Sequence, residues 1–351
     1  MRCVVAVVLV VGCYSPSPHS GSPCVDGTCP TPLVCSQATL TCEYSDMPID
    51  ADVGMADSPP DSPPDAQLID GCTPAAELCG DGIDQDCDGN DPACAANDTA
   101  AGAIDITAGG MFTGNLVFAH DDVAANGCSG NGGRDLYYSI NLAAPRVYYF
   151  DTFGSNFDTV IRVYGRSCAT VGTGGMARAC QNDSCNGTQS QVAVSLPAGP
   201  SCVVIDQASS AQTNGNVTLK VIVGTRDGTA LPAGMQMVSG DTTNATNVFD
   251  PVDVNCDGPG SGGRDLAYFF TACPNQSLQL DAETCTGASW DTVLYVRNGN
   301  TSQVGCNDDA CGNNQSRITN VSITNGLFYW LVIDGYDNAD YGTYTLKTYL
   351  R

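Results

Sequence analysis

The chain of 351 residues carries one sequence pattern twice. Five short motifs recur in the same order, and each second occurrence lies about 130 residues after the first. In the first copy the motifs are 132–136 (GGRDL), 157–160 (FDTV), 180–185 (CQNDSC), 204–206 (VID) and 215–220 (GNVTLK). In the second copy they are 262–266 (GGRDL), 290–293 (WDTV), 306–311 (CNDDAC), 332–334 (VID) and 342–347 (GTYTLK). Since an ordered set of this kind does not recur by chance, the duplication predicts two copies of one domain.

Short runs rich in β-branched and aromatic residues follow one another within each copy, as is typical of strands. Residues 136–142 (LYYSINL) alternate in polarity, and residues 159–164 (TVIRVY) are rich in valine and isoleucine. Gly, Asn, Asp and Pro punctuate the gaps between such runs, and apolar residues show no helical period. The sequence therefore predicts an all-β protein with two tandem antiparallel β-sandwiches or jelly rolls, residues 97–225 and 226–351.

The order of the repeated motifs resembles that of the bacterial pre-peptidase C-terminal domain. The second copy matches best, with the strings D-L-x-Y-x-F, D-T-V-L-Y-V, N-D-D, Y-x-L-V-I-D-G and G-x-Y-T-L. The first copy departs in two strings, since Ser184 follows Asp183 and Gln207 follows Asp206. The resemblance covers most of residues 110–351. It implies a β-sandwich of the kind usually appended to secreted proteases, some members of which bind matrix polymers or Ca²⁺.

The first residues have the pattern of an export sequence. Arg2 is followed by an apolar run, residues 3–11, which is too short to span a bilayer as a helix. The run ends in Gly12 and Cys13, which resemble the bacterial lipobox, whose cysteine becomes the lipidated N-terminus. Residues 1–12 are therefore expected to be a lipoprotein signal peptide, with the lipid on Cys13 as the membrane anchor of an outer-membrane or cell-surface protein. The alternative is an ordinary signal peptide followed by a cysteine that carries no lipid.

Two segments with little apolar content follow this start. Residues 13–43 form a small module in which Cys24, Cys29, Cys35 and Cys42 must supply, through disulfides, the stability that a core would give. Residues 44–71 are dominated by Pro, Asp and Ser, which predicts a disordered, extended linker. Together they form a disulfide-rich, Pro/Asp-rich stalk before the repeats.

The 20 cysteines predict an extensive disulfide framework. Each repeat holds five, an odd number, so either one bond joins the two copies, or each copy pairs outside itself or keeps a thiol. Spacing favours two local bonds around the Asn-Asp loops, a hairpin bond in the second copy and a bond between the copies. These predicted pairs are Cys180–Cys185, Cys306–Cys311, Cys273–Cys285 and Cys128–Cys256.

Residues 72–96 contain the sharpest local motif, D-x-D-x-D-G at residues 84–89. This order opens a Ca²⁺-binding EF-hand loop, in which alternate carboxylates face one cation. The twelfth position is Ala95 and not Glu, and no helices are expected on either side, so the segment is not an EF-hand. Residues 79–89 instead resemble the C-G-D-G-x-D-x-D-C-D-G metal-binding motif of MopE-type and myxobacterial surface proteins. This resemblance implies a cation site, with the candidate ligands Asp84, Asp86, Asp88 and Asp91. The alternative is an acidic turn stapled by Cys72, Cys79, Cys87 and Cys94.

Acidic residues also recur beside the strand ends of the repeats. If these loops meet at one end of each sandwich, their carboxylates form a Ca²⁺ site. The alternative is that Asp135 and Asp265 pair with the preceding Arg134 and Arg264, while the other acids cap turns. The candidate ligands are Asp135, Asp158 and Asp183 in the first copy and Asp265, Asp291, Asp308 and Asp309 in the second.

Composition narrows the function. A formal net charge of −25 argues against nucleic acid and against anionic lipid as partners. The only histidines are His19 and His120, so a zinc site and a catalytic base for a nucleophile are hard to build, and we expect no enzyme. Trp290 and Trp330 lie in strand-like patterns, which favours core packing over a sugar-binding platform.

The sequence therefore favours a non-enzymatic surface lipoprotein whose cation-stabilised sandwiches bind a polysaccharide or a protein. One alternative is a metal-sequestering protein that uses residues 79–91. Another is a structural spacer in the cell envelope.

Overall fold

The computed structural model describes residues 28–29, 33–35, 42–44, 75 and 77–351, except for 124–127, 129–132, 174, 212–214, 253–255, 257–261, 300–301, 313 and 325–326. The predicted signal peptide, Cys13 and the linker beyond Tyr44 lie outside the described residues. The chain divides into two units, Met1–Ala66 and Gln67–Arg351. In the first unit, β1 (Leu33–Cys35) and β2 (Cys42–Tyr44) form an antiparallel hairpin.

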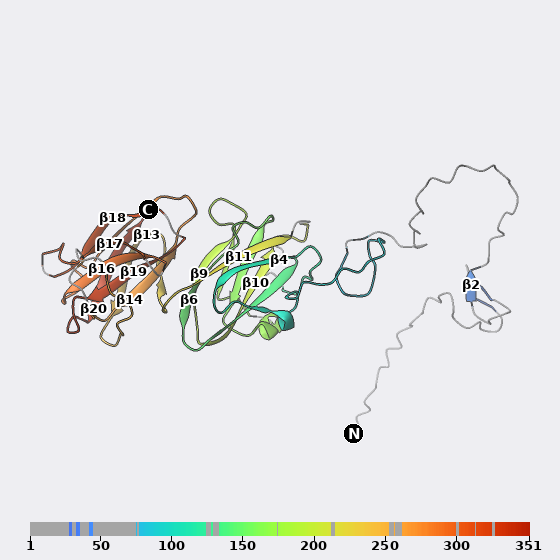
Figure 1. Ribbon diagram of the computed structural model, residues 1–351, viewed down its shortest axis with the longest axis horizontal. Helices are drawn as coiled ribbons and strands as arrows, with labels where there is room; N and C mark the ends of the chain where they lie inside the picture. The colour runs from blue at the N-terminus through green and yellow to red at the C-terminus, as the bar shows by residue number, and fades with distance from the viewer. Residues whose placement is uncertain are drawn as a thin grey trace, which may run out of the picture. The chain divides into compact units, whose positions relative to one another are not determined.

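Four sheets make up the second unit, two for each sequence repeat (Figure 1). The first sandwich has a five-stranded sheet with the order β3-β5-β10-β7-β8 and a four-stranded sheet with the order β4-β11-β6-β9. The second sandwich repeats both sheets as β12-β14-β19-β16-β17 and β13-β20-β15-β18. The paired strands are antiparallel, apart from the short edge strands β3 and β12, which run parallel to β5 and β14. The predicted all-β fold with tandem antiparallel sandwiches is thus confirmed.

The strand boundaries follow the apolar runs of the sequence. In the first sandwich the strands are β3 (Ile104–Asp105), β4 (Gly110–Asn115), β5 (Asp135–Leu142), β6 (Arg146–Asp151), β7 (Thr159–Tyr164), β8 (Ala179–Asn182), β9 (Gln191–Leu196), β10 (Gly199–Gln207) and β11 (Asn216–Val223). In the second they are β12 (Thr229–Ala230), β13 (Gly234–Asp241), β14 (Leu266–Thr271), β15 (Leu278–Glu283), β16 (Thr292–Asn298), β17 (Ser302–Asn307), β18 (Arg317–Ile323), β19 (Phe328–Gly335) and β20 (Thr343–Leu350). Two 3₁₀ helices, η1 (Ala100–Gly102) and η2 (Cys168–Thr173), belong to the first sandwich.

Alternating residues of each strand face the core between the two sheets of its own sandwich. On β11, for example, Val217, Leu219 and Val221 lie in the first core. The duplication extends to buried polar groups. The Oγ1 atoms of Thr152 and Thr159 lie 2.6 Å apart, and those of Thr284 and Thr292 lie 2.7 Å apart. This shared contact aligns β6 with β15 and β7 with β16.

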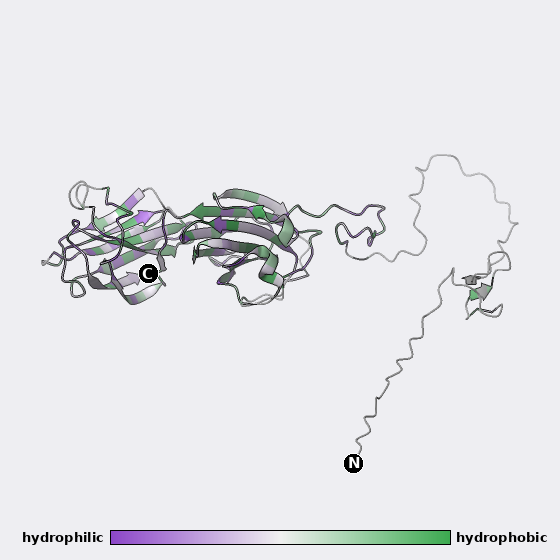
Figure 2. Ribbon diagram, turned by 90° about the horizontal axis from the view of Figure 1, so that it is seen from below, coloured by the Kyte–Doolittle hydropathy of each residue, from purple (hydrophilic) through white to green (hydrophobic). Residues whose placement is uncertain are grey.

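A third apolar layer joins the two sandwiches. Val147 and Tyr149 of β6 belong to a buried cluster with Phe269, Phe328 and Trp330 on the five-stranded sheet of the second sandwich. The rings of Tyr149 and Phe328 lie 6.1 Å apart. Residues at alternate positions of β6 face the first core, so this strand is buried on both sides. This double burial accounts for the run of apolar and aromatic residues from Val147 to Phe150. Along the strands of the sandwiches as a whole, hydrophobic and hydrophilic residues are interspersed (Figure 2).

The linker between the sandwiches, residues 224–228, passes directly over this layer. A Cβ atom at Gly228 would lie 2.7 Å from the ring of Trp330, and one at Gly224 would lie 2.9 Å from it. Both positions therefore need glycine for the close approach of the linker backbone to the indole. Gln191 closes the edge of the layer, because its Nε2 donates to the carbonyl oxygen of Ala272 at 2.9 Å.

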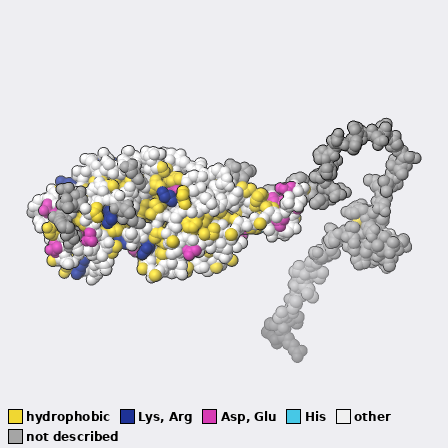
Figure 3. Space-filling model, in the orientation of Figure 1, with side chains coloured by type: hydrophobic (Ala, Val, Ile, Leu, Met, Phe, Trp, Pro, Cys, Tyr) yellow, Lys and Arg dark blue, Asp and Glu magenta, His cyan; other side chains and the backbone are white. Residues whose placement is uncertain are grey.

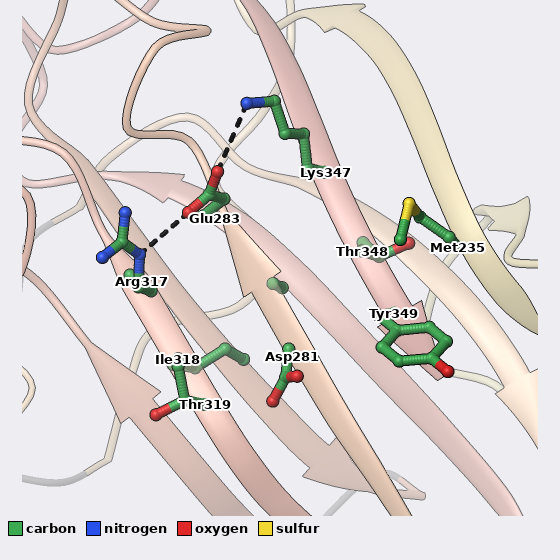
Figure 4. A pocket seen from close by; sticks show the side chains of 10 residues that line it. Met235, Asp281, Glu283, Arg317, Ile318, Thr319, Lys347, Thr348 and Tyr349 are labelled. Atoms are coloured by element: carbon green, nitrogen blue, oxygen red, sulfur yellow. Dashed lines mark hydrogen bonds and ion pairs between the residues drawn. The ribbon is translucent and has the colours of Figure 1, made fainter. Parts of the chain in front are cut away.

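The equivalent outer face of the second sandwich is exposed and carries charged side chains beside Met235 and Tyr349. Where β6 has Tyr149 and β9 has Ala193, β15 has Asp281 and β18 has Thr319. Figure 4 shows Glu283 between two cationic side chains, the guanidinium of Arg317 at 2.8 Å and the ammonium of Lys347 at 3.3 Å. A hollow of about 370 Å³ lies over this face. The two repeats thus share a fold but differ in the role of their four-stranded sheets.

In the first sandwich, the outer face of the five-stranded sheet is covered by other segments of the same sandwich. Tyr137, Tyr164 and Val204 of the five-stranded sheet form a buried cluster with Val171 of η2. The disulfide between Cys168 and Cys202 ties η2 to β10. Among the described residues, no large apolar sheet face is therefore left uncovered on this side of the first sandwich.

The disulfide pairing differs from the pairs that spacing predicted. The two sandwiches are joined by Cys185–Cys273, which resolves the odd number of cysteines in each repeat. The other bonds of the repeats are Cys128–Cys180, Cys168–Cys202, Cys256–Cys306 and Cys285–Cys311. All eight candidate cysteines are bonded, but none of the four predicted pairs forms.

Local conformation explains this difference. Cys180 lies within β8 and bonds back to Cys128, before β5. Asp183 and Cys185 have positive φ angles of 55° and 61°, so the chain turns sharply and Cys185 lies beside Cys273 of the second sandwich.

Six disulfides of this kind indicate an oxidising compartment outside the cytosol. Among the described residues, no helix has the length and apolar character needed to cross a membrane.

Candidate cation sites

The acidic motif folds as a loop closed by the disulfide between Cys79 and Cys94. Asp84 accepts hydrogen bonds from the backbone amides of Asp88 at 3.1 Å and Gly89 at 2.8 Å. Gly89 has a φ of 89°, the left-handed conformation that the D-x-D-x-D-G pattern predicts for its glycine. Acidic side chains gather on this part of the surface (Figure 3). The loop therefore has the turn geometry of a cation-binding loop without the flanking helices.

Glu77 is a further candidate ligand that the spacing of the motif did not predict. Oxygen atoms of Glu77, Asp84 and Asp86 all lie within 4.8 Å of one another. Glu77 is 5% exposed, and its Oε2 accepts from the amides of Gln85 at 3.0 Å and Asp86 at 2.9 Å. Its Oε1 is buried and has no hydrogen-bond partner among the described residues. A buried carboxylate oxygen of this kind favours a cation as its missing partner.

Two of the predicted ligands of this motif lie outside the cluster. Asp91 accepts from the amides of Gly80 at 2.6 Å and Gly82 at 2.7 Å, so its carboxylate fastens the start of the loop. Asp88 is exposed, and its Oδ1 accepts from the amide of Asn90 at 2.8 Å. The structure therefore brings together Glu77, Asp84 and Asp86, and it gives Asp88 and Asp91 local roles in the turns.

A second acidic cluster lies at one end of the second sandwich. Asp291 precedes β16, and Asp308 and Asp309 follow β17, so antiparallel pairing of these strands brings the three carboxylates within 4.8 Å. In the first sandwich the corresponding residues are Asp158, Asn182 and Asp183. Burial raises the pKa of Asp158, and the charge of Asp183 raises it further. The first copy thus has two of the three acids, Asp158 and Asp183, as the alignment of the two repeats indicated.

Asp135 and Asp265 belong to neither cluster. Asp135 is the first residue of β5 and Asp265 directly precedes β14, and each lies beside a second buried aspartate of the adjacent strand, Asp206 and Asp334 respectively. Arg134 is not the partner of Asp135, because consecutive residues of an extended chain point to opposite sides. The pairing alternative for these two acids is therefore wrong in its choice of arginine.

Each buried pair of aspartates contacts one arginine, which is not the arginine that precedes Asp135 or Asp265 in sequence. Arg162 of β7 contacts Asp206 with Nε at 3.0 Å and Nη2 at 2.9 Å, and both side chains are fully buried. In the second sandwich Tyr295 occupies the place of Arg162 and donates its hydroxyl to Asp334 at 3.0 Å. The cation comes instead from Arg226 in the linker, which forms an ion pair with Asp265. At this site each sandwich thus buries a pair of carboxylates with one cation.

This imbalance predicts that stability falls as pH rises. Burial raises the pKa of Asp135 to about 9, with a further contribution from the charge of Asp206. Because the folded pKa lies above the usual value of 3.8, the folded state holds a proton that the unfolded state releases between about pH 4 and pH 9. The stabilisation is complete below pH 4 and is lost as pH rises through 9.

We expect Asp135→Asn to flatten this dependence. The asparagine keeps an oxygen that accepts from the amides of Asp122 and Val123, as Asp135 does at 2.9 and 2.7 Å, but it carries no charge. The thermal midpoint of the variant, measured by circular dichroism, should exceed that of the wild type by several degrees at pH 9 and differ little at pH 5. A variant less stable than the wild type at both pH values contradicts this account of the pair.

Comparison with known proteins yields only remote structural neighbours. No family model and no curated protein matches the chain. The chain is similar to the pre-peptidase C-terminal domain of a collagenase from Bacillus anthracis, with 13% identity and a TM-score of 0.24 over 34% of this chain and 93% of that domain. It is also similar to a triple jelly roll protein of an archaeal virus turret, with 12% identity and a TM-score of 0.21 over 68% of this chain and 58% of the other. A xanthan lyase from Paenibacillus gives 11% identity and a TM-score of 0.20, over 69% of this chain and 25% of the lyase. Values this low assign no function to the chain.

Proposed function

We propose that this chain is an exported, non-enzymatic surface protein, held by a lipid on Cys13, whose sandwiches form a Ca²⁺-stabilised module that binds a polysaccharide or a protein. The observation that carries the cation is the buried Oε1 of Glu77, which lacks a hydrogen-bond partner among the described residues and belongs to the cluster with Asp84 and Asp86. Carboxylate oxygens in a tight loop are the ligands that Ca²⁺ prefers.

The position of this loop connects cation binding to the sandwiches. The amide of Cys79 donates to the carbonyl oxygen of Phe118 in the first sandwich at 3.2 Å. A cation held between Glu77 and the two aspartates would therefore fix the loop against the sandwich as well as close it. The shared apolar layer and the Cys185–Cys273 bond then hold the second sandwich in place. Such a rigid pair of sandwiches suits the display of a binding surface, and its outer loops are where we expect the ligand.

Thermal unfolding of the oxidised chain tests the cation site. We expect Ca²⁺ to raise the midpoint by several degrees relative to chelator, since a ligand at a hundredfold excess over Kd stabilises by about 2.7 kcal/mol. Glu77→Gln should abolish most of this shift, because the amide keeps the shape of the side chain and removes its charge. The matched control is Asp88→Asn, which changes an acid of the same loop outside the cluster and should leave the shift in place. No shift in the wild type, or an equal shift in Glu77→Gln, would refute the site.

The cluster of Asp291, Asp308 and Asp309 favours a second cation site in the second sandwich. The same titration with Asp309→Asn separates the two sites, because this variant should lose only the contribution of the second sandwich. The sequestration alternative predicts that a peptide of residues 72–96 binds the metal alone, and the spacer alternative predicts no ligand for the sandwich loops. A glycan array probed with Ca²⁺ and with chelator distinguishes these from the binding module.

A further inference from the structure

A different set of donor atoms surrounds the disulfide that closes the acidic loop. Sγ of Cys79 lies 3.9 Å from Oδ2 of Asp98 and 3.9 Å from Nδ1 of His120. The imidazole and the carboxylate are themselves 2.7 Å apart. Ligand atoms of Cys79, Cys94, Asp98 and His120 all lie within 4.8 Å of one another. Two sulfur atoms, one nitrogen and one oxygen therefore form one compact group of donor atoms.

The fold holds Cys79, Asp98 and His120 in place independently of the disulfide. The amide of His120 donates to Oδ1 of Asp98 at 2.8 Å, and the carbonyl oxygen of His120 accepts from the amide of Asp135 at 2.9 Å. The amide of Cys79 is bonded to the sandwich through Phe118. Cys79 and Asp98 are 0% and 1% exposed, so water competes little for the interior of the cluster. Breaking the bond between the two sulfur atoms would leave these backbone contacts intact.

We propose that Cys79, Cys94, Asp98 and His120 bind a divalent cation of the zinc class when the Cys79–Cys94 bond is reduced. Two thiolates, an imidazole nitrogen and a carboxylate oxygen make up a ligand set that zinc accepts in tetrahedral sites. With zinc–sulfur and zinc–nitrogen bonds of about 2.3 and 2.0 Å, a tetrahedral site separates sulfur from nitrogen by about 3.5 Å. The 3.9 Å between Cys79 and His120 is close to this separation. This site is distinct from the Glu77 cluster and does not depend on the function proposed above.

The redox step is balanced by a low-molecular-weight thiol. Two molecules of the thiol transfer two electrons and two protons to the protein disulfide, which becomes two cysteine thiols, while the reductant becomes its own disulfide. The cation then displaces the two thiol protons and any proton held between His120 and Asp98. In the oxidised chain the same sulfur atoms are bonded to each other and cannot act as thiolate ligands. The state of one disulfide therefore decides whether the site exists.

Site-specific alkylation tests this proposal on the full chain. The chain is reduced with a water-soluble phosphine, which supplies the same two electrons and binds zinc weakly. It is then treated with iodoacetamide with and without one equivalent of Zn²⁺, and modified cysteines are located by peptide mapping. We expect Zn²⁺ to slow alkylation of Cys79 and Cys94 by about tenfold or more, because a thiolate bound to the metal is no longer free to react.

Two variants make the result specific. His120→Gln should abolish the protection, because the amide can still bond to Asp98 but does not replace an imidazole on zinc. Asp122→Asn changes a neighbouring acid outside the donor set and should leave the protection unchanged. Equal alkylation with and without Zn²⁺ overturns the proposal, and so does protection that persists in His120→Gln. Failure of Cys79–Cys94 to open at a reductant concentration that opens every other bond overturns it as well.

Discussion

Replacing Arg226 with methionine is expected to lower the free energy of unfolding by about 3–5 kcal/mol. The guanidinium of this linker residue is 11% exposed and is ion-paired with the fully buried Asp265. Its Nη2 also donates to the carbonyl oxygen of Asp265 at 3.0 Å. Without it, the carboxylates of Asp265 and Asp334 are left in the second sandwich with no cation, which is costly in a water-poor environment. Urea unfolding of the oxidised chain at neutral pH measures the difference.

Two further variants identify the cause of that loss. Asp265→Asn combined with Arg226→Met removes the uncompensated charge and should recover a large part of the stability. Arg146→Met changes an exposed arginine at the start of β6 and should cost little. If the double variant were as unstable as Arg226→Met alone, the role of the arginine would lie in packing the linker and not in neutralising the buried acids.

The second large effect is expected at the layer between the sandwiches. Trp330→Ala should destabilise the chain by about 3–5 kcal/mol, because the indole is fully buried and the linker glycines hold the backbone against it. The ring packs edge-on against Phe249, Phe269 and Phe328, at centroid distances of 5.7, 6.2 and 5.1 Å. Alanine would leave a cavity in the apolar layer through which the two sandwiches now contact each other. The same urea titration gives the change in free energy.

Trp330→Phe provides the matched control. The indole nitrogen has no hydrogen-bond partner among the described residues, so phenylalanine loses ring area but no polar contact. It should cost well under half as much as alanine. Comparable losses for phenylalanine and alanine would mean that this position tolerates no rearrangement of the layer. A small loss for both would mean that the two sandwiches are stable without it.

The fold was predictable from the sequence because its evidence is local and repeated. Strand-like runs separated by turn residues specify the sheets, and the second copy confirms each motif of the first. The stacking of the sandwiches was not predictable in this way, since a strand such as β6 does not say what covers its outer face. One indication was present, however. The unbroken apolar run from Val147 to Phe150 is typical of a strand covered on both sides, whereas the alternating run at β15 is typical of a strand with one face in water.

The candidate cation sites were predictable only in part, for a related reason. The spacing of Asp84 and Asp86 indicates two candidate ligands of one loop, because alternate residues of a turn point toward the same centre. Glu77 lies beside these two aspartates because the chain folds back on itself, and the spacing of the motif does not predict this contact. Asp135 lies outside the predicted site because strand pairing places it beside Asp206. Arg226 replaces Arg162 from a different segment altogether. Contacts between segments decide these cases, and a single sequence does not reveal them.

The Cys185–Cys273 bond has a mechanical consequence. It joins residues separated by 88 positions in sequence, so the covalent path from the first sandwich to the C-terminus bypasses the segment between them. A pulling force applied between the N-terminal side and the C-terminal end of the chain would run through this bond and leave strands β9 to β14, with the linker between the sandwiches, outside the line of tension. The parts of both cores that these strands supply would thus carry no load until the Cys185–Cys273 bond breaks.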